Sequence, residues 1–255
     1  MPTKHAFGFV RHNLGCKSMD LKETDILGEK IVEHWYYRSK SKAMMKLLSG
    51  LSPSTILDIG AGSGFFSNHL LKNSYAKKAW CVDIEYKEDA DTFCNGKPLH
   101  FRSSVGKVDA DLVLLMDVLE HVDDDVSLLR DVVVKVPCGA KFLISVPAFQ
   151  FLWSNHDIFL EHKRRYSLTE LRDAVEESGL YVNHMCYYFS LVLPMAATLR
   201  ILQRIGLFKD QVESQMQTHH PLVNSFLKNL CDLELHWLQL NRLAGLTVFC
   251  LAEKR

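Results

Sequence analysis

The stretch Thr55 to Leu70, TILDIGAGSGFFSNHL, decides the fold that we predict for this chain. A short apolar run containing an acid is followed by glycine at three alternate positions, Gly60, Gly62 and Gly64, and then by a helix-forming segment. Glycine reaches backbone conformations that other residues avoid and lets a ligand lie against the main chain. The first turn of a helix offers free N–H groups. The pattern therefore predicts a strand, a ligand-binding turn and a helix.

A second short apolar run, Ala79 to Val82, ends in Asp83, 19 residues after Gly64. An acid at the tip of the second strand is where a doubly wound sheet binds the ribose of a nucleotide. The alternative is an unliganded turn in a packed sheet. Such a turn has no need of three glycines and two flanking acids.

The spacing of the glycines separates two classes of nucleotide cofactor. In the dinucleotide fingerprint GxGxxG, the third glycine lets the helix pack on the strand and the loop receives a pyrophosphate. Here the third glycine comes one residue earlier, and no Lys or Arg lies between Asp58 and Leu71 to meet phosphate charge. Asp58 would repel a phosphate but suits a ligand with an ammonium group. The pattern D-x-G-x-G-x-G with a later Asp resembles the S-adenosylmethionine (SAM) site of class I methyltransferases.

Length and charge limit the classes of function. The chain has 255 residues, 47% of them hydrophobic, which is enough for one large α/β domain. Thirty basic and thirty acidic residues cancel, so no overall field attracts nucleic acid, although a local basic patch is not excluded. The seven cysteines form no CxxC pair, as expected for reduced thiols in the cytoplasm. The N-terminus lacks the apolar core of a signal peptide, so export is not expected.

Strand and helix patterns alternate along the chain as a parallel sheet requires. We predict a doubly wound, mostly parallel α/β sheet of seven strands, Rossmann-like, with an antiparallel last strand and a helical insertion before it. One domain spans residues 1–255. It comprises a helical N-terminal cap (1–50), an α/β core (51–188 and 246–255) and an apolar helical insertion (189–245). The predicted strands are 55–59, 79–83, 99–102, 111–116, 141–146, 181–188 and 246–252.

The insertion begins with an uncharged stretch, Cys186 to Leu199, that is interrupted by Pro194 and is too short to span a bilayer. Three alternatives stay open for it: packing in the core or in a homodimer contact, docking of residues 189–207 to the inner face of a membrane, and a lid over the active site. A second helix, Pro221 to Leu243, has apolar residues at helical spacing, which predicts a packing stripe.

The fourth strand ends at Met116 and Asp117, and Glu120 and His121 follow one turn later. Ligands of an open α/β sheet lie beyond the carboxyl ends of its strands, so these side chains border the ligand. The run L-E-H-V after an acid resembles a branch that includes ubiquinone-biosynthesis O-methyltransferases and small-RNA 3′-end 2′-O-methyltransferases. The resemblance implies a Mg²⁺-like ion on Asp117, Glu120 and His121, beside the acceptor hydroxyl. The alternative is that Glu120 and His121 only cap the loop.

The loop after the fifth strand carries further polar residues. Its run P-x-x-x-x-L-W-S-x-H-D, followed by H-x-R-R-Y-S, resembles a bacterial subgroup of type 11 and type 23 methyltransferase domains that is linked with lipid and cell-envelope glycan metabolism. An ordinary imidazole titrates near working pH, so His156 or His162 can remove a proton from an acceptor hydroxyl, or can instead anchor the loop. His121 is the third catalytic candidate. The basic run 163–165 is expected to be solvated or paired with carboxylates, with an acceptor phosphate as the alternative.

The resemblance implies SAM as the cofactor and assigns its contacts. In this assignment Asp58 and the glycines hold the amino-acid end, Asp83 binds the ribose hydroxyls, and Ser103 stands where many relatives place an acid beside the adenine. Three aromatic residues, Trp35, Tyr36 and Trp153, are candidates for the acceptor wall or for the core. The predicted cofactor-binding residues are Asp58, Gly60, Gly62, Gly64, Asp83, Ile84, Ser103, Met116 and Asp117.

Three functions remain open at this point. We expect direct displacement of the sulfonium methyl by an acceptor hydroxyl of a small-molecule, lipid-linked or glycan substrate, helped mainly by alignment and exclusion of water. The first alternative is an RNA 2′-O-methyltransferase with a divalent metal, against which the neutral charge argues. The second is a SAM-binding protein without turnover. That function predicts loss of the glycines or of Asp83, and both are present.

Overall fold

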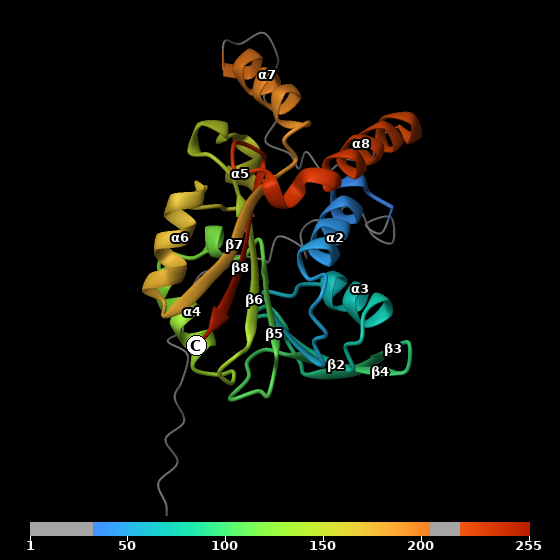
Figure 1. Ribbon diagram of the computed structural model, residues 1–255, viewed down its shortest axis with the longest axis vertical. Coiled ribbons are helices and arrows are strands. Elements are labelled where there is room, and N and C mark those ends of the chain that lie inside the picture. Colours follow the sequence, from blue (N-terminus) through green and yellow to red (C-terminus); the bar gives the residue numbers. More distant parts are fainter. Residues whose placement is uncertain (1–32, 205–219) are drawn as a thin grey trace, which may run out of the picture.

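The computed structural model describes residues 33–204 and 220–255, and its centre is one eight-stranded sheet (Figure 1). The strand order is β3-β4-β2-β1-β5-β6-β8-β7. The pairs from β4 through β6 are parallel, whereas β8 runs antiparallel to both β6 and β7. The strands are β1 Thr55–Ile59, β2 Lys78–Val82, β3 Ala90–Cys94, β4 Lys97–Arg102, β5 Leu112–Met116, β6 Lys141–Pro147, β7 Leu180–Tyr188 and β8 Thr247–Lys254.

The predicted doubly wound sheet is confirmed, but the number of seven strands is wrong by one. The short strand predicted at 99–102 is half of a hairpin, because β3 pairs antiparallel with β4 at the edge of the sheet. The turn between them is Asn95-Gly96, and both residues have positive φ, 51° and 73°. This pair favours the tight turn whose twist matches two antiparallel strands.

Helices cover both faces of the sheet (Figure 1). One core cluster joins α2 and α3 to one face through Tyr37 and Leu70, and a second joins α4 and α6 to the other face through Leu129 and Leu171. The central strand β5 is buried along its whole length because both of its faces are covered. The helices are α2 Trp35–Leu47, α3 Phe65–Asn73, α4 Asp125–Val133, α5 Asn155–Phe159, α6 Leu168–Glu177, α7 Leu193–Arg204 and α8 Pro221–Glu234, with 3₁₀ turns η2 Leu119–His121, η3 Gln150–Leu152 and η4 Leu235–Leu240.

The parallel strands β2, β1 and β5 lie where the direction of the chain crossovers in the sheet reverses. The strand β1 lies between β2 and β5, so consecutive crossovers leave it in opposite directions. The side chains that follow these three strands therefore meet at one edge of the sheet, which is where ligands bind in folds of this kind. The predicted site residues that follow β1, β2 and β5 belong to this edge.

The cap and the second part of the insertion pack against each other. The backbone N–H of Trp35 donates to Asn224 Oδ1 at 2.8 Å, and Lys42 pairs with Asp232 at 2.6 Å. The part of the predicted cap that precedes residue 33 lies outside the described residues. The predicted helix from Pro221 to Leu243 is shorter than expected, because the α-helix ends at Glu234 and a 3₁₀ turn continues it.

The first part of the insertion behaves differently. The helix α7 extends away from the sheet (Figure 1), and Met195 and Ile201 on it are 53% and 58% exposed. Of the alternatives for the insertion, packing in the core therefore holds for α8, where Leu227 and Cys231 are buried. It does not hold for the exposed side of α7. No helix within the described ranges is long and apolar enough to cross a bilayer.

The buried cysteines give a test of the fold. Burial raises the pKa of Cys186, Cys231 and Cys250 to about 12, so these thiols stay protonated and unreactive at pH 8. Cys138 is exposed. In a Cys16→Ser background, iodoacetamide at pH 8 should modify Cys138 in the folded protein and leave the other three intact, as mass spectrometry of tryptic peptides will show. Denatured protein, in which all of these thiols react, is the control; native labelling of the three would contradict the packing.

Candidate active site at the carboxyl edge of the sheet

The glycine turn between β1 and α3 adopts the conformation that only glycine reaches easily. Gly60, Gly62 and Gly64 have φ values of 67°, 51° and 73°. A Cβ on Gly60 would lie 2.7 Å from Val118 Cγ2, and one on Gly64 would lie 3.1 Å from the Phe101 ring. Val118 comes shortly after β5, so the end of this strand lies against the turn. Glycine is therefore required at these two positions both by backbone conformation and by space.

The acid Asp83, directly after β2, holds this turn in place. Its Oδ2 accepts the N–H of Gly62 at 3.0 Å, and its Oδ1 accepts the N–H of Glu85 at 3.0 Å. The hydroxyl of Tyr86 donates to the carbonyl of Gly62 from the other side. A carboxylate can accept about four hydrogen bonds. Asp83 thus keeps capacity for a ligand hydroxyl while it fixes the loop.

The acid of β1, Asp58, is 2% exposed and accepts a hydrogen bond from Ser67 Oγ at 2.7 Å. Ser67 is on α3, so this bond joins the strand before the turn to the helix after it. The two acids, the three glycines and the absence of a cation between residues 58 and 71 fit SAM, which carries an ammonium group, a sulfonium and a ribose but no phosphate.

Two further predicted cofactor-binding residues, Ile84 and Ser103, the second of them beside the adenine, lie on the neighbouring strand ends. Ile84 is 69% exposed beside Asp83, and Ser103 is exposed directly after β4. The backbone N–H of Ser103 donates to Asp89 at 3.4 Å. Phe101 packs edge to face against Tyr86, with ring centroids 5.5 Å apart. The rings of Phe101 and Tyr86 therefore lie near Ser103, at the position where the resemblance implies an acid.

At the end of β5, Asp117 takes part in a buried ion pair that sequence reasoning missed. Lys40 on α2 is 0% exposed, and its Nζ contacts Asp117 Oδ2. The hydroxyl of Tyr36 donates to the same oxygen at 3.1 Å, and Ser145 Oγ donates to Oδ1 at 3.2 Å. Met116 is buried and accepts a long contact from Ser145 Oγ at 3.7 Å. Asp117 is thus occupied by three protein groups, and a magnesium site on Asp117, Glu120 and His121 is not supported.

The cap also supplies aromatic rings to this edge. Tyr36 stacks on Phe189 with ring centroids 5.3 Å apart, and Trp35 meets Phe189 edge to face at 5.6 Å. Phe189 follows β7 at the start of the insertion. Its ring adds to the acceptor wall that was predicted for Trp35 and Tyr36. Trp153, the third predicted ring, is half-buried after η3.

Three residues that follow strands at the carboxyl edge of the sheet have left-handed backbone conformations without being glycine. Asp117 follows β5, Phe149 follows β6 and Phe189 follows β7, with φ values of 59°, 59° and 64°. Such conformations cost of order 1–3 kcal/mol each and gather at functional sites. All three lie at the edge where the predicted site residues meet.

Two of the predicted catalytic histidines lie together, and Glu120 lies with them. One nitrogen from each of His121 and His162 and an oxygen of Glu120 lie within 4.8 Å of one another. The two rings meet edge to face with centroids 4.8 Å apart. Burial raises the pKa of Glu120 well above its ordinary value, and the nearby Asp117 charge raises this pKa further.

The segment from α5 to α6 is organised around Asp157, which is 0% exposed. Its carboxylate pairs with His162 Nδ1 at 2.9 Å and with Arg165 Nε at 2.7 Å. Both partners depress the pKa of Asp157 below its ordinary value even though burial opposes them. The basic run 163–165 is paired with carboxylates, as predicted: Lys163 with Asp123 at 2.5 Å, Arg164 with Asp125 at 3.5 Å and Arg165 with Asp157.

The third predicted catalytic histidine, His156, belongs to α5. Burial lowers its pKa to about 4, and the neighbouring His162 contributes to the decrease. The imidazole is therefore neutral at pH 7 and can accept a proton. The structure does not place it in the cluster formed by Glu120, His121 and His162.

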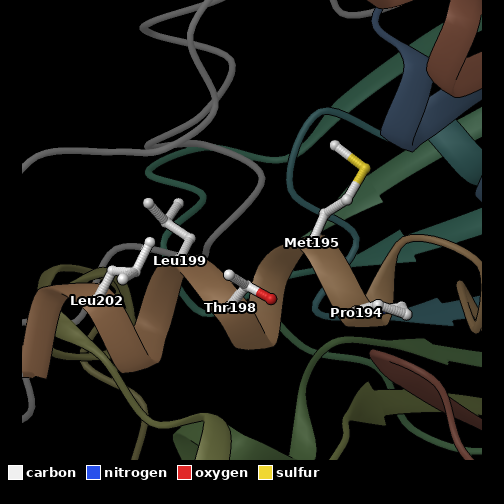
Figure 2. A pocket seen from close by; sticks show the side chains of 5 residues that line it. All are labelled: Pro194, Met195, Thr198, Leu199 and Leu202. Carbon is white, nitrogen blue, oxygen red and sulfur yellow. The ribbon is translucent and has the colours of Figure 1, made fainter.

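A shallow hollow of about 450 Å³ lies along α7 and involves none of the residues above. It is lined almost entirely by apolar side chains, and Figure 2 shows Met195 and Leu199 projecting from the same side of the helix. Leu199 is 41% exposed. The lining residues are Pro194, Met195, Thr198, Leu199 and Leu202.

Solved structures with the same fold include enzymes of more than one kind. The methyltransferase solved with the Trm112 methyltransferase activator of Haloferax volcanii aligns over 85% of this chain and 90% of its own, at 16% identity and a TM-score of 0.54. The [4+2]-cyclase SpnF aligns over 86% and 81%, at 11% identity and 0.52. A protein of Bacillus halodurans C-125 described as a methyltransferase aligns over 85% and 99%, at 11% identity and 0.51. These similarities show the fold, which hosts different reactions.

The comparison of sequences adds the family. No curated protein matches the chain. The family model described as a methyltransferase domain matches residues 32–185, which include the cap helix, the glycine turn, both acids and the histidine cluster. The chain therefore belongs to the methyltransferase-domain family, among the class I SAM-dependent methyltransferases of the type 11 and type 23 kind.

Proposed function

We propose that this protein transfers the methyl group of SAM to a hydroxyl of an acceptor with an apolar portion, a lipid-linked or glycan-lipid molecule being the preferred class. Its SAM-dependent methyltransferase family supports the transfer. The exposed apolar side of α7, at one end of the insertion, is the observation that carries the acceptor class.

The cofactor side of the proposal assigns each predicted residue a task. Asp58 and the backbone of the glycine turn bind the amino-acid end, and Asp83 binds the ribose through its remaining lone pairs. Ile84 and Ser103 flank the adenine, and Met116 and Asp117 border the reacting end. SAM supplies a methyl group that is already activated by the positive sulfur. The protein therefore needs chiefly to align the acceptor oxygen and to exclude water.

Charge and hydrophobicity around the acceptor edge fit this task. Lys40 neutralises Asp117, the acid that directly follows β5. The rings of Trp35, Tyr36 and Phe189 form a wall that keeps water away. We assign the removal of the hydroxyl proton to His156, because its half-buried imidazole is neutral at pH 7. We further propose that the cap and the insertion together form the acceptor-binding part of a single domain spanning residues 1–255.

Incubation with radiolabelled SAM tests the proposal. Fractionated lipid, glycan and RNA pools are incubated with the wild type, and label should enter the lipid or glycan pool. Asp83→Ala should reduce incorporation about tenfold or more, because a hydrogen bond to a charged group contributes about 1.5–3 kcal/mol. His156→Gln should slow transfer about 100-fold with SAM affinity unchanged. Leu199→Glu should weaken capture of an apolar acceptor, with Leu243→Glu, at a 90% exposed position off α7, as the matched control.

Each other outcome favours one of the alternatives. Label in RNA alone would replace the acceptor class with an RNA 2′-hydroxyl. SAM binding without label in any pool would favour a protein that binds SAM and does not turn it over. Equal incorporation by Leu199→Glu and Leu243→Glu would remove α7 from acceptor binding, and liposome flotation or light scattering of the same variants would then test membrane docking and a homodimer contact.

A further inference from the structure

Asp157 joins the helix that carries His156 to the segment that follows this helix. Its carboxylate is 0% exposed and accepts hydrogen bonds from the backbone N–H and the Oγ of Ser154, at 2.9 and 3.1 Å. The same carboxylate pairs with His162 Nδ1 at 2.9 Å and accepts from Nε and Nη2 of Arg165 at 2.7 and 3.0 Å. These groups fill the capacity of a carboxylate, which accepts about four hydrogen bonds. The task of Asp157 therefore lies within the protein.

The segment that contacts this carboxylate is itself fixed to the ends of two strands. Arg165 Nη1 donates to the carbonyl of Ala148, directly after β6, at 3.0 Å. The backbone N–H of Lys163 donates to the carbonyl of Glu120, in the turn after β5, at 2.7 Å. These contacts anchor α5, a helix of 5 residues that is too short to be stable by itself, to the carboxyl edge of the sheet. His156 lies on this helix, so the same contacts fix its backbone.

The charge of Asp157 also acts on the imidazole of His156. Three basic groups act on the same ring: His162 and Arg165 from the segment after α5, and Arg200 from α7. Burial is the main cause that lowers the pKa of His156, and the three basic groups lower it further, whereas Asp157 raises it. Loss of this carboxylate would therefore make the imidazole less basic, and a less basic imidazole accepts a proton less readily.

We propose that Asp157 is a positioning residue for His156 in methyl transfer, and that Arg165 holds Asp157 in place. The inference rests on the proposed function, in which His156 receives the acceptor proton. In that step the acceptor oxygen bonds to the methyl carbon, the electron pair of the S–CH₃ bond stays on sulfur, and the hydroxyl proton moves to an imidazole nitrogen. The products are the methyl ether, S-adenosylhomocysteine and an imidazolium, whose charge the Asp157 carboxylate stabilises.

A double-mutant cycle in the transfer assay tests whether Asp157 acts through His156. The probe is radiolabelled SAM with the lipid or glycan pool that the wild type labels, and the rate is measured at saturating SAM and pH 7. Asp157→Asn should lower the rate about tenfold, part of the roughly 100-fold loss expected for His156→Gln, with SAM affinity unchanged. The double variant His156→Gln/Asp157→Asn should be no slower than His156→Gln alone, because the two residues act as a unit. Losses that multiply would overturn the proposal.

The dependence of the rate on pH gives a second readout. The wild-type rate should be constant from pH 7 to pH 9, because His156 is already neutral in this range. Asp157→Asn should instead gain rate as the pH rises, because the acceptor hydroxyl then ionises without the base, and the deficit relative to the wild type should shrink. A deficit that is the same factor at every pH would indicate a purely structural role and would overturn the proposal.

The matched control is Glu170→Gln, because Glu170 has the same capping-box position on α6 as Asp157 has on α5 and is exposed. It should keep the wild-type rate and pH profile. If Asp157→Asn folds poorly, Arg165→Gln leaves the carboxylate in place and should show the same pH-dependent loss.

Nuclear magnetic resonance of the full-length protein, recorded without SAM or acceptor, separates this inference from the proposed function. The ring resonances of His156, assigned with His156→Gln, should shift in Asp157→Asn and stay in place in Glu170→Gln. Unshifted resonances in Asp157→Asn would overturn the positioning role. Shifted resonances in a protein that labels no pool would support the positioning and count against the proposed methyl transfer.

Discussion

Lys40→Met should destabilise the protein by about 3–5 kcal/mol, the effect of removing one partner of a buried ion pair. Lys40 is 0% exposed, and Asp117, its partner, is 7% exposed. Without the ammonium group, the carboxylate keeps only the hydrogen bonds from Tyr36 and Ser145 and stays buried with an uncompensated charge. Urea unfolding followed by circular dichroism measures the free energy of unfolding.

A matched control lies on the same helix, α2. Lys42 pairs with Asp232, but their side chains are 35% and 37% exposed, so solvent screens the pair. Lys42→Met should therefore cost less than about 1 kcal/mol. The double variant Lys40→Met/Asp117→Asn removes both charges and should recover much of the loss. If Lys40→Met and Lys42→Met were equally stable, the ion pair between the cap and β5 would not exist.

Gly245→Ala should destabilise the protein by about 3 kcal/mol, at the upper end of the range for overpacking. A Cβ at this position would lie 2.3 Å from the carbonyl oxygen of Tyr188 and 2.9 Å from its backbone nitrogen. These are main-chain atoms, so no side-chain rotation relieves the clash. The backbone bond from Leu246 N to Tyr188 O, 2.9 Å long, lies beside the clash and would be strained as well.

The control for this change is Gly106→Ala, because a Cβ on Gly106 meets nothing within 4 Å and its φ is not in the left-handed region. This substitution should be neutral or slightly stabilising, since alanine reduces the entropy of the unfolded chain. The same urea unfolding series compares the two variants. Equal stability of Gly245→Ala and Gly106→Ala would mean that the entry to β8 is not packed as described.

Much of the fold could be predicted from local sequence because the relevant signals are local. Apolar runs that contain or precede an acid mark β1 and β2, and the capping box of Ser167 and Glu170 marks the start of α6. The missed strand β3 also has a local signal, the Asn95-Gly96 pair between two alternating segments, which predicts a hairpin. The apolar pattern of a half-buried strand is absent there, because β3 has only one buried residue, Cys94.

The candidate site could be predicted only in part, because some of its contacts join distant segments. Lysine on an amphipathic helix usually reaches solvent, and nothing near Lys40 in the sequence indicates that α2 presses it against the end of β5. The pairing of His162 with Asp157 likewise depends on how the chain turns between α5 and α6. By contrast, glycine spacing and strand-end acids predict the cofactor side from the sequence alone, since they follow one another along the chain.

The insertion leaves the sheet at Tyr188 and returns at Thr247, which are paired in register on β7 and β8. Glu234, at the end of α8, joins the two parts of the insertion, because its carboxylate accepts hydrogen bonds from the N–H groups of Ser190 and Leu191. Because the insertion leaves and re-enters the sheet at one pair of neighbouring residues, its length or composition can change without disturbing the strands. Under the proposed function, substrate preference can therefore change through this insertion and the surface of α2 that packs on α8, while the strands and the glycine turn stay the same.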